Sequence, residues 1–204
     1  KSSSTILQSL IDNNNVEIPY VISQEPKRAK RGNKLLPTEV AIKATKNGID
    51  LLEPRSLDEI KELITDFDFD FLLVAAYGKI LPDWMLSAPV YEPVNVHYSI
   101  LPKHRGASPI QSTILAGDKA AGISIMKMTK GLDEGPIYKK FKIDIKESNK
   151  EELEDKLSVI AAKNITSVLS EIKNKNIKPI DQNEDDASYC KKIKKESGLI
   201  DPQK

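Results

Sequence analysis

The chain has 204 residues, which is enough for one α/β domain with a sizeable core and too few for a multidomain machine. Hydrophobic residues make up 39% of it, so we expect a folded protein and not a disordered one. Lys and Arg number 31 against 30 Asp and Glu, so any nucleic-acid binding must come from a local patch. No apolar run reaches the roughly 18 residues of a membrane span, and the single cysteine, Cys190, cannot form an internal disulfide. We therefore expect a soluble protein of the reducing cytoplasm.

The first third of the chain predicts helices around one strand. Apolar residues at helical spacing predict a helix over residues 5–11, followed by a strand at 16–23. Residues 24–34 carry five cationic side chains without apolar periodicity, which predicts an exposed loop. Two further helices are expected at 37–48, with Pro in the first turn and Gly at the end, and at 56–66, which opens with capping-box spacing.

The middle of the chain alternates strands and helices. Residues 69–76 are nearly all apolar, which is typical of a parallel strand covered by helices on both faces. A second strand is expected at 94–98, a helix at 108–117, and two more strands at 122–128 and 136–145. This alternation predicts a doubly wound α/β fold with a mostly parallel sheet and helices on both faces.

The longest predicted helix comes last. Ser148 and Glu151 have capping-box spacing, and the apolar positions that follow keep a helical stripe for about six turns. Beyond Ile180 the sequence is polar and predicts no strong element. We therefore place one domain at residues 1–180 and a linker at residues 181–204.

Both histidines lie within residues 95–106. Alternate residues of a strand face the same side, so Asn95 and His97 project together at its carboxyl end, where open α/β sheets bind ligands. Such a pair suits acyl-type chemistry, because Asn95 can donate to a developing oxyanion while His97 exchanges a proton near pH 7. A buried histidine bonded to a backbone carbonyl explains the N-x-H spacing equally well.

Asp133 is the candidate third member of this site. It lies in the loop 131–135, where bracketing glycines permit close approach of the backbone. On spacing alone, an aspartate that simply favours a turn is an equal alternative. We expect no metal, because His97, His104 and the distant Cys190 match no zinc spacing. The chain also has neither a G-x-G-x-x-G motif nor a Walker A motif, which excludes the common nucleotide-cofactor sites.

Four stretches of the sequence stand out together: Val74–Pro82 (VAAYGKILP), Asn95–Gly106 (NVHYSILPKHRG), Pro109–Gln111 (PIQ) and Gly131–Gly135 (GLDEG). These stretches resemble the methionyl-tRNA formyltransferase family. The N-x-H, S-x-L-P-x-x-R-G and G-L-D-x-G motifs occur in the order and at the separations of the family. The resemblance extends over about residues 5–202, nearly the whole chain.

The resemblance implies a Rossmann-like formyltransferase fold. It also implies an enzyme that uses 10-formyltetrahydrofolate to formylate the methionine α-amino group on initiator tRNA. It implies that Asn95, His97 and Asp133 are the catalytic residues, with Asp133 orienting His97. It implies that backbone groups of Tyr77, Gly78, Lys79, Ile80 and Leu81 line the pterin pocket of the folate site. It further implies that Ser99, Leu101 and Pro102 shape the region beside that pocket. The residues it implies for tRNA phosphates are Arg28, Lys30, Arg31 and Lys34. A solvated charge run is the alternative for these four cations.

The family pattern also contains two segments with no counterpart in this sequence. It has a strand ahead of the first helix and a β-barrel domain after the catalytic domain, so we expect a central strand to be missing before Lys1 and residues 181–204 to lead toward such a barrel. Relatives with the same three residues formylate an amino sugar nucleotide or a glycinamide ribonucleotide, or hydrolyse formyl-folate. A non-catalytic folate- or tRNA-binding relic is a further alternative. We expect a cytoplasmic monomer without membrane contact.

Overall fold

The computed structural model describes residues 1–28, 35–145, 148–193 and 197. The longer strands are β1 Tyr20–Ile22, β4 Asp50–Leu52, β5 Phe71–Ala75, β6 Glu92–His97, β8 Ala120–Lys127 and β9 Ile137–Asp144. Four strands have two residues each: β2 Lys27–Arg28, β3 Leu35–Leu36, β7 Arg105–Gly106 and β10 Tyr189–Cys190. The helices are α1 Ser2–Ile11, α2 Glu39–Lys46, α3 Lys61–Thr65, α4 Asp83–Leu86, α5 Pro109–Leu115 and α6 Lys150–Lys173, with 3₁₀ turns η1 Leu57–Ile60 and η2 Glu184–Asp186.

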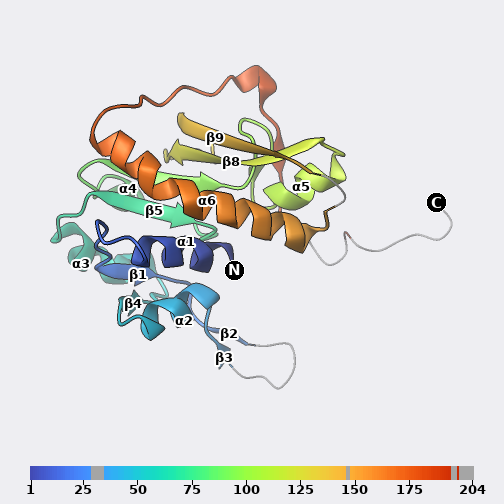
Figure 1. Cartoon of the computed structure of the whole chain (residues 1–204). Helices are drawn as coiled ribbons and strands as arrows, with labels where there is room; N and C mark the ends of the chain where they lie inside the picture. The colour runs from blue at the N-terminus through green and yellow to red at the C-terminus, as the bar shows by residue number, and fades with distance from the viewer. Residues whose placement is uncertain (29–34, 146–147, 194–196, 198–204) are drawn as a thin grey trace.

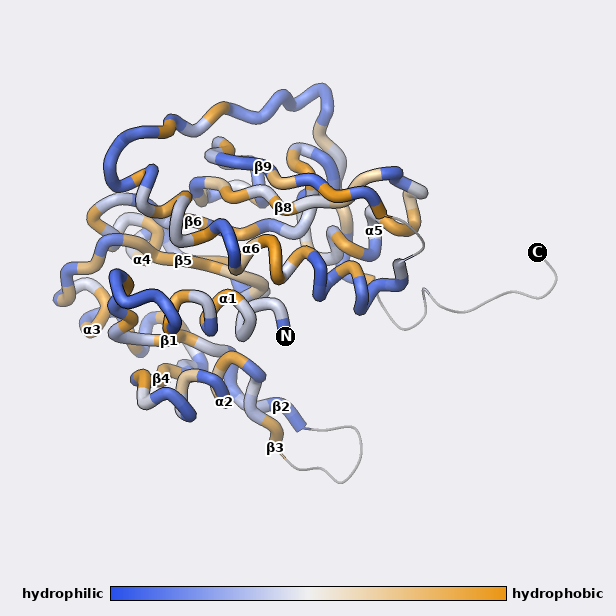
Figure 2. Tube along the Cα trace, viewed as in Figure 1, coloured by the Kyte–Doolittle hydropathy of each residue, from blue (hydrophilic) through white to orange (hydrophobic). Residues whose placement is uncertain are grey.

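Helices cover both faces of the main sheet, whose strand order is β5-β6-β8-β9 (Figure 1). The alternation along β5 shows this directly. Phe71, Leu73 and Ala75 pack into the core formed with α1 and α6, whereas Leu72 and Val74 pack against η1, α3 and α4. Figure 2 shows β5 as a largely apolar stretch inside the molecule. The α/β class and the two-sided cover that the sequence predicts are confirmed.

The strand directions differ along the sheet. β5 runs parallel to β6, and β1 runs parallel to β4 in a separate pair. β8 pairs antiparallel with both β6 and β9. The short connection between β8 and β9 has the length of a hairpin link and not of a parallel crossover, so these two strands must be antiparallel. The parallel arrangement expected from the sequence therefore holds for the pairs β1–β4, β5–β6 and β7–β10, whereas β2–β3, β6–β8 and β8–β9 are antiparallel.

Helix α6 begins one residue later than the sequence predicts. The Asn149 side chain accepts hydrogen bonds from the backbone amides of Glu151 and Glu152, and the Glu152 carboxylate accepts one from the Asn149 amide. Ser148 instead accepts a hydrogen bond from the Lys156 ammonium group. Both Ser-x-x-Glu and Asn-x-x-Glu are present at this position, so spacing alone selected the wrong cap.

A groove separates β1 from β5. Within the part of the chain that the structure describes, β1 pairs only with β4, and β5 pairs only with β6. The groove is lined by both of these strands and by the start of α1. Every residue of β5 is only half-buried as a result, although its sequence is that of a fully covered strand. The expectation that a further strand belongs here stays a prediction, which a stability measurement can test.

The chain after α6 returns along the body of the molecule to the far end of the sheet (Figure 1). There β10 pairs in parallel with β7, and the Arg105 amide donates to the Ser188 carbonyl at 2.8 Å. The segment thus lies against residues of the first 180, and the division at residue 180 stays a prediction. Among the described helices, none is both long and apolar enough to cross a membrane.

Candidate active site

Strand β6 carries Asn95 and His97 to the carboxyl edge of its parallel pairing with β5. Val94 and Val96 point into the core beneath α6, so Asn95 and His97 project from the opposite face of the strand. Both are nearly inaccessible, at 9% and 5% exposure. Buried amide and imidazole groups require hydrogen-bond partners, and the loops at this edge supply them.

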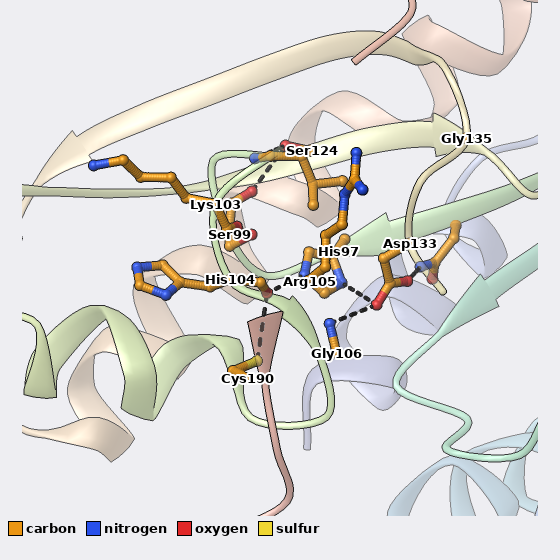
Figure 3. Close-up of polar contacts among 12 residues, drawn as sticks. His97, Ser99, Lys103, His104, Arg105, Gly106, Ser124, Asp133, Gly135 and Cys190 are labelled. Atoms are coloured by element: carbon orange, nitrogen blue, oxygen red, sulfur yellow. Dashed lines mark hydrogen bonds and ion pairs between the residues drawn. The ribbon is translucent and has the colours of Figure 1, made fainter. Parts of the chain in front are cut away.

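Asp133 lies in the loop between β8 and β9, and Figure 3 shows its carboxylate facing His97. The carboxylate also reaches Asn95. Its Oδ1 accepts a long hydrogen bond from Asn95 Nδ2 at 3.4 Å, and its Oδ2 lies 3.6 Å from His97 Nδ1. The same Oδ2 accepts from the Gly106 amide at 2.9 Å. Asp133 has a φ of 53°, a left-handed conformation that aspartate tolerates better than most residues. The structure thus brings the three predicted residues together, while their catalytic role stays a prediction.

The other side of the His97 ring is fixed by a backbone group. His97 Nε2 lies 3.0 Å from the His104 carbonyl oxygen, which can only accept, so Nε2 carries the proton. The remaining nitrogen, Nδ1, faces the Asp133 carboxylate. The His104 side chain points elsewhere and pairs with Asp118 at 2.7 Å. His97 therefore combines the two alternatives that the sequence left open: its Nε2 bonds to a backbone carbonyl, and its Nδ1 lies beside a carboxylate.

The turn after β6 is held from inside by Ser124. The Ser124 hydroxyl donates to the Ser99 carbonyl at 2.8 Å and accepts from the Leu101 amide at 3.0 Å. The Ser99 hydroxyl in turn donates to the Lys103 carbonyl at 2.6 Å. Ser99 and Leu101 are almost completely buried, and Pro102 is partly exposed. The described contacts of Ser99 and Leu101 are those of residues that shape this turn.

The loop Tyr77–Leu81 begins at the same edge of the sheet. Ala75 is the register partner of Val96, so the chain leaves β5 beside His97. Gly78 has a φ of 72°, which glycine adopts without strain. Leu81 is buried among the apolar residues of η1, α3 and α4, whereas Ile80 is 90% exposed.

Polar contacts fix two other residues of this loop. The Lys79 ammonium group donates to the carbonyls of Pro54 and Arg55, both at 3.3 Å. The Tyr77 carbonyl accepts from the Gln24 amide group. The Tyr77 hydroxyl is buried without a hydrogen-bond partner in the described structure, and burial raises its pKa, so it is a neutral donor.

The predicted tRNA-binding cations fall on the β2–β3 hairpin and its connection. Arg28 is exposed on β2. Lys30, Arg31 and Lys34 lie outside the described residues. In the described ranges, no group of three or more His, Cys, Asp or Glu side chains is placed to hold a metal ion.

Sequence reasoning missed several residues next to the site. Arg105 is fully buried, and its guanidinium binds Gln182, Glu184 and Tyr189 from the segment after α6. The hydrogen bond from Arg105 lowers the pKa of Glu184, and the same bond raises the pKa of Arg105. The arginine stands in the S-x-L-P-x-x-R-G motif and could have been singled out there. Gln182 lies in a polar stretch without periodicity or motif, so the sequence gives no signal for it.

Comparisons with known proteins identify the family of this chain. Residues 2–169 match the family described as formyl transferase. The methionyl-tRNA formyltransferase of Dictyoglomus thermophilum is 41% identical over 202 residues, which cover 97% of this chain and 64% of that protein. That of Mesoplasma florum is 39% identical over 196 residues, covering 96% and 63%. The chain therefore spans slightly less than two thirds of the length of these relatives.

Solved structures share the fold at low sequence identity. Glycinamide ribonucleotide transformylase 1 from Symbiobacterium toebii superposes with a TM-score of 0.72 at 21% identity, covering 88% of this chain and 90% of that one. Methionyl-tRNA formyltransferase from Clostridium thermocellum gives a TM-score of 0.62 at 22% identity, covering 91% and 77%. Because residues 2–169 match the family throughout, this chain belongs to the formyl transferase family.

Proposed function

We propose that this chain is the catalytic domain of an enzyme that transfers a formyl group from 10-formyltetrahydrofolate to the methionine α-amino group of initiator tRNA. The observation that carries the proposal is the convergence of the Asp133 carboxylate on Asn95 and His97 at one sheet edge. The relatives named methionyl-tRNA formyltransferase, 41% and 39% identical to this chain, support the choice of amine substrate.

Each of the three side chains has a distinct task in this reaction. 10-Formyltetrahydrofolate supplies the formyl carbon, which the neutral amine nitrogen attacks. One hydrogen of the Asn95 amide faces Asp133, and the other donates to the oxyanion that develops on the formyl oxygen. As the bond to the folate nitrogen breaks, the proton lost by the amine passes through Asp133 and His97 Nδ1 to that leaving nitrogen. The new carbon–nitrogen bond replaces the old one, and no other reactant is consumed.

The proposed folate contact is formed by two loops. Tyr77, Gly78, Lys79, Ile80 and Leu81 belong to the loop after β5, and Ser99, Leu101 and Pro102 belong to the turn after β6. The buried, unpartnered Tyr77 hydroxyl supports a polar ligand here, because an orphaned donor gains a hydrogen bond when the ligand arrives. Ser99 and Leu101 contribute by fixing the turn that carries His104 to His97.

The tRNA partner is proposed to meet the β2–β3 hairpin, which lies at the periphery beyond α2 (Figure 1). Arg28, Lys30, Arg31 and Lys34 supply positive charge for phosphates. Leu35 and Leu36 are 64% and 55% exposed on the same hairpin. A cytoplasmic monomer remains part of this proposal.

The direct test supplies 10-formyltetrahydrofolate and compares three acceptors: charged initiator tRNA, an amino sugar nucleotide and glycinamide ribonucleotide. We expect formyl transfer to the charged tRNA and at most trace transfer to the other two. Faster formylation of the sugar nucleotide or the glycinamide ribonucleotide reassigns the acceptor. Hydrolysis of the donor without transfer to any acceptor contradicts the proposal.

A second experiment tests the tRNA contact. Replacing one of the four cations by Ala should weaken tRNA binding equally across tRNA sequences. It should also lower the slope of log affinity against log salt concentration by about one unit. Titrations at low salt provide the range, and folate affinity serves as the control, because the hairpin lies outside the Asn95–His97–Asp133 cluster. An unchanged slope after removal of all four charges would show that these cations are solvated and do not contact tRNA phosphates.

A further inference from the structure

We propose that Arg105, Gln182 and Glu184 are positioning residues for Asp133, so that the segment after α6 contributes directly to the rate of formyl transfer. We call these three residues the clasp. The proposal deepens the proposed function and rests on it, since it assigns the clasp to the same reaction. It concerns a segment that the sequence alone predicts to be a linker.

Arg105 is the centre of the clasp. Its side chain is fully buried, and all of its donor nitrogens are used. Nε and Nη2 donate to Gln182 Oε1 at 3.0 and 2.9 Å, and Nη1 and Nη2 donate to the two Glu184 carboxylate oxygens at 2.9 and 2.7 Å. Nη1 also donates to the Tyr189 hydroxyl at 2.9 Å. A buried guanidinium satisfied in this way holds its partners in fixed directions.

Gln182 connects Arg105 to the Asp133 loop. Its Oε1 accepts from Arg105, which orients the amide so that Nε2 points away from the arginine. Nε2 donates to the carbonyl oxygens of Asp133 and Gly135, at 2.8 and 2.7 Å. Both of its polar atoms are therefore committed, one to the buried cation and the other to the backbone of the loop.

Asp133 is held from two sides by one dipeptide. The Gly106 amide donates to its carboxylate (Figure 3). The neighbouring Arg105 reaches its backbone carbonyl through Gln182. Arg105 and Gly106 form β7, whose partner β10 belongs to the same returning segment as Gln182. The position of the Asp133 carboxylate beside His97 is thus set jointly by β7 and by residues that follow α6.

Apart from the clasp and the Gly106 amide, the described polar side-chain contacts of this loop to the rest of the molecule are the long Asn95–Asp133 hydrogen bond, the Asp133–His97 approach and an exposed Lys130–Asp83 ion pair. The side chains of the loop between Met128 and Gly135 are exposed or only partly buried, and Leu132 is 58% exposed. Asp133 occupies a left-handed conformation that costs a non-glycine residue free energy. At Gly135 an added Cβ would lie 2.0 Å from the Lys127 carbonyl oxygen, so the backbone is also tightly seated where the loop ends.

The experiment compares Gln182→Leu with wild type in the complete protein. Leucine keeps the approximate volume but removes the amide, so we expect kcat to fall about 10- to 100-fold, with KM for both substrates nearly unchanged. Asn183→Ala is the matched control, because Asn183 lies in the same segment and bonds only within it, to Asp185 and Asp186 in the described structure. Amide hydrogen exchange of residues 129–135 should accelerate in Gln182→Leu and stay at the wild-type rate in Asn183→Ala.

A double-mutant cycle separates positioning from general damage. If Gln182 acts through Asp133, Gln182→Leu should cost less than about twofold in kcat when Asp133 is already Asn. A full additional loss in the Asp133→Asn background overturns the proposal, as does an unchanged kcat or an equal loss in Asn183→Ala. Inactivity of the wild-type chain toward every acceptor contradicts the proposed function instead. In that case the amide hydrogen exchange of residues 129–135 tests whether the clasp holds the Asp133 loop. Unchanged exchange in Gln182→Leu refutes that role.

Discussion

The Asp133 carboxylate is the point where the site is assembled. It contacts Asn95 and the Gly106 amide and faces His97, and these groups come from β6 and β7. Two of the three are buried side chains that could not be satisfied by solvent. The same carboxylate therefore stabilises the buried polar groups. In the proposed reaction it would also take part in proton transfer.

Removing a proton-transfer group should slow the chemical step and leave binding largely intact. We expect His97→Ala and Asp133→Asn each to lower formyl transfer about 10²- to 10⁴-fold, with the donor affinity close to wild type. The measurement is single-turnover transfer together with equilibrium folate binding. Asp118→Asn is the control, because it removes the partner of the other histidine side chain, His104, and leaves the His97 contacts in place. Near-normal turnover of either active-site variant would exclude that residue from catalysis.

Glu184 should contribute to stability in a pH-dependent way. The hydrogen bond from Arg105 lowers its pKa in the folded protein, so the folded state binds fewer protons than the unfolded state in the acid range. This contribution is complete above the unfolded pKa of about 4.3 and is lost as the pH falls through the lower folded value. Its size is limited because the side chain is 67% exposed.

The expected result is a smaller acid dependence in Glu184→Gln. Between pH 7 and pH 3 the thermal midpoint of wild type should fall further than that of the variant, while the two curves converge at low pH. Asp185→Asn, one residue along η2 and absent from the described partners of Arg105, should keep the wild-type dependence. Parallel curves for wild type and Glu184→Gln would contradict the assigned pKa shift.

At the scale of elements, the sequence predicts the long helices and the main strands and fails at short pieces. The apolar stripe of α6 and the apolar run of β5 are visible in the sequence. A helix buried on one face has apolar residues at regular spacing, and a strand covered on both faces has them at nearly every position. β7 and β10 have two residues each, and their pairing depends on the buried Arg105 and on a chain that returns from α6. Such tertiary contacts leave no periodicity in the sequence.

The site divides in the same way. Asn95 and His97 follow from strand alternation, and Asp133 follows from its glycine-bracketed loop together with the family motif. The backbone groups that orient them, the His104 carbonyl and the Gly106 amide, have no residue-type signature. A backbone donor or acceptor is available at nearly every position, so only the folded chain reveals which ones are used.

The start of α6 allows a test of cap assignment. Because the Asn149 side chain accepts two backbone amides, Asn149→Ala should lower the free energy of unfolding by about 1 kcal/mol. Ser148→Ala should have a much smaller effect, since its hydroxyl contacts only the exposed Lys156 in the described structure. Denaturant titration of both variants measures the difference. A larger loss for Ser148→Ala would restore the cap position predicted from spacing.

At the scale of the whole molecule, the groove between β1 and β5 leaves strand edges and apolar side chains uncovered among the described residues. Each strand offers one edge to it that has no strand partner among the described residues, and half-buried apolar side chains line its walls. Helix α1 begins at the end of the groove where β5 ends, and the Ser3 hydroxyl donates to the Ala75 carbonyl at 2.7 Å. A strand that runs parallel to β5 and leads directly into α1 would therefore lie in the groove.

Fusing an apolar strand of about five to seven residues ahead of Lys1 should raise the thermal midpoint strongly, because each large side chain that it buries contributes roughly 1.5–3 kcal/mol before ordering costs. Amides of β1 and β5 that gain strand partners should exchange more slowly. The control is a fusion of equal length with alternating Gly and Ser, which lengthens the chain without apolar burial. If both fusions unfold at the same temperature as the original chain, the groove is not a strand position, and the half-burial of β5 is a stable feature of this fold.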